Sequence, residues 1–99
     1  MEKTIKKARA EHFSKVYSTN VLVSETDSDV RLYGFNEVIN TDGNEKIAIS
    51  DGEFILTYQA AVLLYEQMSA LMEKWESSGK KVEVSESRRD LTKKLLENF

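Results

Sequence analysis

The sequence predicts an α+β domain: an antiparallel meander of three to four strands packed on one long helix, with a short C-terminal helix. Three segments within residues 16–56 alternate apolar and polar side chains, and their connections are too short for the crossovers that parallel strands need. The stretch that follows has apolar side chains at helical spacing. A sheet followed by one long helix predicts two layers, with the helix as the lid.

Residues 1–15 are interpreted as an N-terminal arm or a short helix. Ile5, Ala8 and His12 have helical spacing, but so short a helix is marginal in water unless it packs against something. His12 is the only histidine of the chain, and no serine, cysteine or second histidine is placed to assist it. We therefore expect it to have a packing or surface role rather than a catalytic one.

Residues 16–79 are expected to form the main body, which begins with two strands. The first covers residues 16–24, and its high content of β-branched side chains supports the assignment. One of its faces is formed by alternate residues: Tyr17, Thr19, Val21 and Val23. The second strand covers residues 29–39, where Gly34 predicts a bulge or a close approach of another backbone.

The rest of the sheet is predicted from residues 40–56. Residues 40–44 carry a strong turn signal, and residues 46–50 alternate again. Asp51 and Gly52 fit either a two-residue hairpin turn or a bulge within one continuous strand. These two readings give four strands or three.

The long helix is predicted between Thr57, a suitable N-cap, and Gly79, a suitable residue just past the C-terminus. Its first half is apolar nearly all round except at Gln59, which is typical of a helix buried on more than one side. A chain of 99 residues has little material to cover both sides, so a partner subunit is the natural second cover. The alternatives are that the sheet and chain ends cover the helix within a monomer, or that its apolar stripe lines a ligand pocket. The predicted oligomer interface consists of Tyr58, Ala61, Val62, Tyr65, Met68, Met72 and Trp75.

Residues 80–99 are predicted to be a tail with a strand and a helix. Val82 and Val84 are candidates for an edge strand, and Ser87 with Asp90 is a weak start signal for a helix over residues 87–98. The apolar stripe of this helix is a candidate docking site for a partner and consists of Leu91, Leu95, Leu96 and Phe99. The tail helix docks either on its own subunit or on another protein, and the sequence favours neither.

Asp29 and Arg31 are two residues apart on a predicted strand and therefore share one face. The favoured interpretation is a surface ion pair within the chain. The alternative is a cross-subunit pair that gives Arg31 a role in the register of an oligomer.

Three short motifs resemble a small prokaryotic family of uncharacterised domains. The motifs are Tyr17-x-x-Asn-Val-x-Val-Ser24, Asp29-x-Arg-Leu32 and Thr57-x-x-x-Ala-x-x-Leu64, and the resemblance covers roughly residues 16–77. Val30 stands where the family favours phenylalanine, and Tyr58 where it favours proline. The resemblance implies a small stand-alone protein of a prokaryote or phage, and it supplies no catalytic residue.

The composition argues against most kinds of catalytic, metal and cofactor chemistry. The chain has no cysteine and a single histidine, and its four glycines are scattered outside any phosphate-binding loop. We expect no cofactor, no metal site and no enzymatic activity. No apolar run has the length of a membrane span, and the N-terminus lacks the apolar core of a secretory signal, so a cytoplasmic location is expected.

The charge distribution indicates which kinds of partner the chain is suited to bind. Residues 17–79 carry eleven acidic and three basic side chains, whereas residues 1–16 carry five basic and two acidic ones. We expect a homo-oligomeric structural or protein-interaction module that associates with itself as a dimer or tetramer, with another protein as a further candidate partner. The alternative is a nucleic-acid-binding module that uses the basic ends and stacks bases on Tyr17, Tyr33 and Phe35. The acidic body argues against this alternative, because it would repel phosphate.

Overall fold

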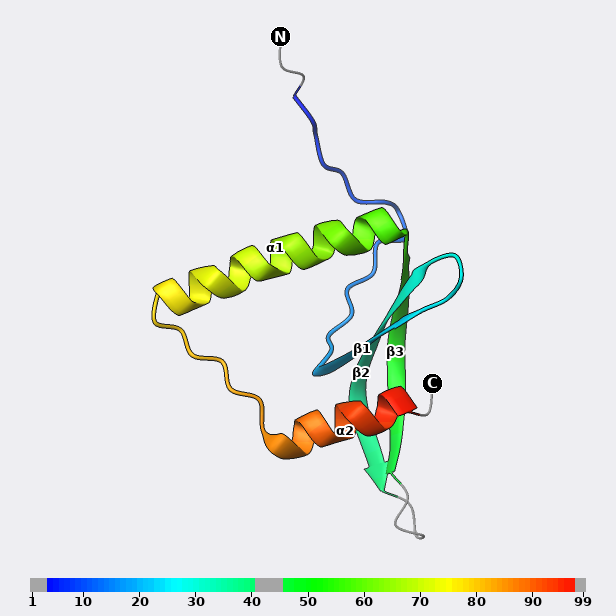
Figure 1. Ribbon diagram of the computed structural model, residues 1–99. Coiled ribbons are helices and arrows are strands. Elements are labelled where there is room, and N and C mark those ends of the chain that lie inside the picture. The colour runs from blue at the N-terminus through cyan, green and yellow to red at the C-terminus, as the bar shows by residue number, and fades with distance from the viewer. Residues whose placement is uncertain (1–3, 41–45, 98–99) are drawn as a thin grey trace.

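The computed structural model describes residues 4–40 and 46–97. Within these residues the elements are β1 (Asn20–Glu25), β2 (Val30–Asn40), β3 (Lys46–Leu56), α1 (Tyr58–Ser77) and α2 (Glu86–Glu97). The strands form one antiparallel sheet in the order β1-β2-β3 (Figure 1). The predicted α+β class, the meander, the long helix and the short C-terminal helix are confirmed. The predicted turn at residues 40–44 and the side chain of Phe99 lie outside the described residues.

The first strand is shorter than the sequence predicts. β1 starts at Asn20, and residues 16–18 leave the strand direction to pass over the sheet. Gly34 makes room for them, since a Cβ at that position would overlap the hydroxyl of Ser18. At Gly52 a Cβ would lie 3.5 Å from a methyl group of Val16, an ordinary contact. The atoms that approach Gly34 belong to a side chain rather than to the backbone that the sequence predicts, and the register shift between Gly34 and Phe35 fits the predicted bulge.

β3 is one continuous strand, so the hairpin alternative at Asp51 and Gly52 is wrong. Gly34 pairs with Gly52 and Phe35 with Ser50, which leaves Asp51 as an extra residue on β3. The next shift places Asn36 as an extra residue on β2. Two opposite bulges restore the register, which is why the pairing continues along both strands.

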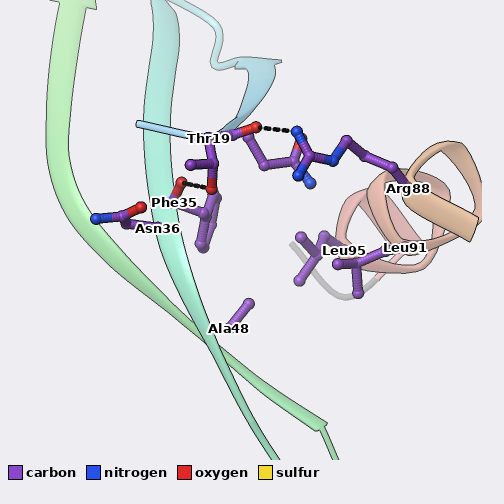
Figure 2. A pocket seen from close by; sticks show the side chains of 8 residues that line it. Thr19, Phe35, Asn36, Ala48, Arg88, Leu91 and Leu95 are labelled. Atoms are coloured by element: carbon purple, nitrogen blue, oxygen red, sulfur yellow. Dashed lines mark hydrogen bonds between the residues drawn. The ribbon is translucent and has the colours of Figure 1, made fainter. Parts of the chain in front are cut away.

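α2 covers one face of the sheet, which we call the covered face. Here lie the two buried hydrophobic side chains of the described chain, Leu22 and Phe35, which are 2% and 4% exposed. Leu91 and Leu95 of α2 line a hollow of about 160 Å³ together with Phe35 (Figure 2). The largest contact of α2 with the sheet is with β1.

Both ends of α1 form as the sequence predicts. The Thr57 hydroxyl accepts a hydrogen bond from the amide of Ala60 at 3.1 Å. At the other end Gly79 has a φ of +78°, and its amide donates to the carbonyl of Glu76. The amide of Lys80 donates to the carbonyl of Trp75, which completes a Schellman motif.

α1 does not form the expected lid. It leaves the end of β3 and runs away from the sheet, and the segment after it returns the chain to α2 (Figure 1). The contact of α1 with the sheet is slight and lies mainly with β3, and no residue of α1 is buried. The chain measures 64 × 36 × 29 Å and has a radius of gyration of 17.0 Å, against about 13 Å for a compact domain of this size.

Two local expectations differ from the structure. α2 begins one residue earlier than predicted, and Ser85 rather than Ser87 caps it, since the Ser85 hydroxyl accepts from the amide of Arg88 at 3.3 Å. Val82 and Val84 form no strand, and the segment that carries them runs between α1 and α2 apart from the sheet (Figure 1). Residues 4–19 contain a turn at residues 11–12 but no helix, which fits the arm interpretation.

Candidate interaction surfaces

α1 presents a broad apolar surface that its own chain leaves uncovered. Of the seven residues predicted as an interface, Ala61 and Trp75 are half-buried and the other five are exposed. Three further exposed leucines widen the surface: Leu63, Leu64 and Leu71. At 100° per residue, the apolar side chains from Ala60 to Trp75 span roughly 280° of the helix circumference and leave a narrow polar strip with Gln59, Glu66 and Glu73. We call this surface the α1 arc.

A second uncovered apolar surface lies on the sheet, opposite α2, and we call it the open face. The register aligns three rows across the strands. The rows are Val21–Gly34–Gly52, Val23–Leu32–Phe54 and Glu25–Val30–Leu56. Val21, Val23 and Phe54 are each more than half exposed. Eight of the nine positions are apolar or glycine, so this face has the composition of an interior rather than of a solvated surface.

Val16 and Ser18 cover only part of the open face. With Val21, Leu32 and Phe54 they line a hollow of about 100 Å³ beside the two glycines. The sequence assigned Val16 and Ser18 to the strand face opposite Val21. The structure brings all three to one side of the sheet because the strand direction is lost before Asn20. In the sequence, only Gly34, which leaves space for a close approach, indicated that Val16 and Ser18 lie on the same side of the sheet as Val21.

The chain has an unusually large accessible area, to which the α1 arc, the open face and the exposed residues 4–17 and 78–85 all contribute. It exposes 9213 Å², whereas a compact monomer of 99 residues exposes about 5,700 Å². The difference of roughly 3,500 Å² exceeds what one partner buries in a typical obligate dimer, about 1,000–2,500 Å². The exposed area is therefore sufficient for a large interface.

The apolar stripe of α2 packs largely on its own sheet. Leu91 and Leu95 are half-buried near Phe35, whereas Leu96 is exposed. Figure 2 shows the guanidinium of Arg88 donating to the carbonyl oxygen of Thr19, at 3.0 Å. A further bond joins Thr92 to Asn20 at 3.0 Å. Of the two interpretations of the tail, the structure has the helix docked on its own subunit.

Arg31 lies in a network of charges within the chain. Its guanidinium donates to both carboxylate oxygens of Asp29, at 2.7 and 3.2 Å, and lies 3.6 Å from a carboxylate oxygen of Glu53. The hydrogen bond from Arg31, together with one from the hydroxyl of Thr26, lowers the pKa of Asp29. The favoured ion pair within the chain is present. The sequence did not reveal Glu53, because only the pairing of β2 with β3 brings it close. A cross-subunit role for Arg31 stays a prediction.

The aromatic residues proposed as a base-stacking platform do not form one. Phe35 is buried beneath α2, and Tyr17 precedes β1 and belongs to no strand. Tyr33 is half-buried on the same face as Phe35. A flat exposed platform of three rings is therefore absent from the described chain.

A hollow of about 480 Å³ lies where α1 turns toward α2. Met72, Trp75, Val82 and Val84 provide its apolar lining, and the ammonium group of Lys80 lies 5.0 Å from the centroid of the Trp75 ring. None of its lining side chains is buried, so the hollow is a shallow part of the exposed surface.

Metal-binding clusters and membrane-spanning helices are absent from the described part of the chain. Residues 4–40 and 46–97 contain no group of three or more histidine, cysteine or acidic side chains that could hold a metal ion. None of the helices there has the length and apolar content to cross a membrane.

Comparison of the chain with models of protein families, with curated proteins and with solved structures finds no match. Membership of the small prokaryotic family that the three motifs resemble therefore stays a prediction.

Proposed function

We propose that this protein is a small homo-oligomeric module with a structural or protein-interaction role, and that the α1 arc is its main contact surface. The observation that carries the proposal is that α1, a helix of 20 residues, has no buried residue although roughly three-quarters of its circumference is apolar. An exposed apolar patch of this size marks an interaction site in soluble proteins.

The energetics favour association over a solvated helix. Burial of apolar surface contributes about 25 cal/mol per Å², so covering even 1,000 Å² of it yields a gross gain near 25 kcal/mol. Lost translational, rotational and side-chain freedom offsets much of this gain. Within one chain, Leu22 and Phe35 are the only fully buried hydrophobic side chains that the structure describes, which is a small core for one domain.

The first test is the mass of the protein in solution, measured by light scattering on a sizing column at low and moderate salt. We expect a dimer or tetramer at both salt concentrations, because an apolar interface is insensitive to ionic screening. A single-chain mass at micromolar concentration would refute the proposal.

Two variants test whether the α1 arc is the contact that gives the protein its oligomeric mass in solution. Met68→Glu places a charge within the arc, whereas Gln59→Glu adds the same charge to the polar side of the same helix. Met68→Glu should shift the mass toward one chain, since a buried unpaired carboxylate is costly. Gln59→Glu should leave the mass unchanged. Equal masses for both variants would place the interface elsewhere.

A further inference from the structure

The two uncovered apolar surfaces of this chain lie on different elements, one on a helix and the other on the sheet. The α1 arc is convex, and the open face is a sheet surface, so the pair matches the helix-on-sheet layers of ordinary domains. We propose that two copies exchange their α1 helices, each α1 packing through its arc on the open face of the other copy. This inference deepens the proposed self-association and rests on it.

The two surfaces overlap along part of their length. α1 has 20 residues and is about 30 Å long at 1.5 Å per residue. The three rows of the open face span five residues of β2, about 16 Å, and would cover roughly half of the helix. The middle row of the open face, Val23–Leu32–Phe54, would lie under the centre of the arc near Met68.

Docking in this orientation buries little charge. Glu66 and Glu73 lie on the side of α1 away from Met68 and would stay in water, and the other two charged residues of the helix, Lys74 and Glu76, lie near its C-terminal end. On the sheet, Glu25 is the only charged residue among the nine positions of the three rows, and it lies at the end of β1. The contact therefore avoids the desolvation cost of buried unpaired charges.

The connections of α1 favour the open face of a second copy over that of its own chain. A single residue, Thr57, joins β3 to α1, and the hydroxyl of Tyr58 donates to the carbonyl of Thr26 at 2.7 Å. This bond and the single-residue connection together restrict the direction in which the helix leaves the sheet.

The far end of α1 is restrained as well. Residues 78–85 connect it to α2, which Arg88 and Thr92 tie to the covered face. Folding α1 onto its own open face would carry this end to the opposite side of the sheet from α2. Exchange between two copies covers both surfaces without breaking these contacts, and exchange of identical elements is a low-cost route to a dimer.

Disulfide cross-linking tests the exchange directly, because the natural chain has no cysteine. One chain carries Val23→Cys on the open face, and a second, co-expressed chain carries a cysteine in the arc. The arc positions are scanned one at a time at Ala61, Tyr65, Met68 and Met72. Control cysteines replace Glu66 and Glu73 on the polar side of α1. After mild oxidation, covalent dimers are separated on a denaturing gel without reductant.

We expect a covalent dimer of the two different chains for at least one arc position and none for the two controls. Dimers that form when an arc variant is expressed alone would indicate that two α1 helices pair with each other. That result would overturn the exchange but leave self-association intact. Absence of any cross-link in a protein with dimer mass would also overturn it.

A chain that carries Val23→Cys and Met68→Cys together separates intramolecular from intermolecular docking. An internal disulfide in a species of single-chain mass would show that α1 folds onto its own sheet, which would refute both the exchange and the proposed self-association. A covalent dimer from this chain supports the exchange. Before oxidation, each variant must keep the circular dichroism spectrum and solution mass of the natural protein.

Discussion

At the scale of single residues, two glycines on the open face decide how the chain enters the sheet. Gly34 and Gly52 pair with each other across β2 and β3, and together they make a flat area on which residues 16–18 lie. The two positions differ in how much room they leave. At Gly34 the Ser18 side chain occupies the place of a Cβ, whereas at Gly52 the nearest atom is at van der Waals distance.

This difference predicts opposite effects for the same substitution. Gly34→Ala should lower the free energy of unfolding by about 1–3 kcal/mol, because the added methyl group overlaps the Ser18 hydroxyl. Gly52→Ala should be neutral or stabilising by up to about 1 kcal/mol, because the methyl group fits and the unfolded chain loses freedom. Urea unfolding measures both. Ser18→Ala should restore part of the loss in the Gly34→Ala background, and equal effects of the two glycine substitutions would contradict the argument.

Asp29 makes the stability depend on pH. Its pKa is lowered chiefly by the hydrogen bond from Arg31, so between the folded and unfolded values the folded state binds fewer protons than the unfolded state. The contribution of Asp29 to stability is then complete above the unfolded value, near pH 4, and is lost as the pH falls through the lower folded value. Asp29→Asn should remove this part of the acid dependence.

The measurement is thermal unfolding of the natural protein and of Asp29→Asn from neutral pH down to about pH 2, below the usual range of carboxyl groups. Asp27→Asn removes an acid from the same turn and serves as the control for net charge. If the natural protein and Asp29→Asn lose stability in parallel as the pH falls, the ion pair contributes nothing to the acid dependence.

At the scale of elements, capping side chains define where both helices begin. Thr57 begins α1 immediately after β3, and Ser85 begins α2 after the connecting segment. The sequence identified the first cap but chose Ser87 for the second helix, because Asp90 three residues later resembles a start signal. In the structure the cap lies two residues earlier than that signal implies, and the amide of Arg89 already donates to the carbonyl of Ser85.

Two serine substitutions distinguish these caps. Ser85→Ala should destabilise the first turn of α2 by about 1 kcal/mol, since the amide of Arg88 loses its acceptor. Ser87→Ala lies inside the helix and should have a smaller effect, because alanine is a better helix former than serine. Amide hydrogen exchange in α2 measures the difference. Faster exchange in Ser87→Ala than in Ser85→Ala would assign the cap to Ser87.

At the scale of the whole molecule, apolar area is the dominant feature. The chain exposes roughly 3,500 Å² more than a compact monomer of its length, and both the α1 arc and the open face contribute to the excess. If association covers these surfaces, folding and association are coupled, and the stability of the protein depends on its concentration.

Calorimetry or circular dichroism over a range of protein concentrations measures this coupling. Tm should rise with concentration for the natural protein, because mass action favours the associated folded state. The rise should be smaller for Met68→Glu, which weakens association. A Tm that is independent of concentration in the natural protein would mean that each chain is stable on its own.

The sequence by itself determined the local structure of this protein. Alternation of side chains located the strands, and their short connections required antiparallel pairing. Thr57 and Gly79 fixed the ends of the long helix, because capping depends on the backbone and side chains of a few neighbouring residues. The breadth of apolar residues on this helix also predicted a surface that one small chain leaves uncovered.

Tertiary structure alone decided which surfaces meet. It assigned α2 rather than α1 to the sheet, and it placed Phe35, expected on an exposed face, beneath Leu91 and Leu95. It also turned residues 16–18 over Gly34 and brought Glu53 to Arg31. Periodicity shows which side of an element is apolar but not what covers that side, because the cover depends on the direction in which each element leaves the sheet. Here the bond from Tyr58 to Thr26 holds the start of α1 and so helps to fix that direction.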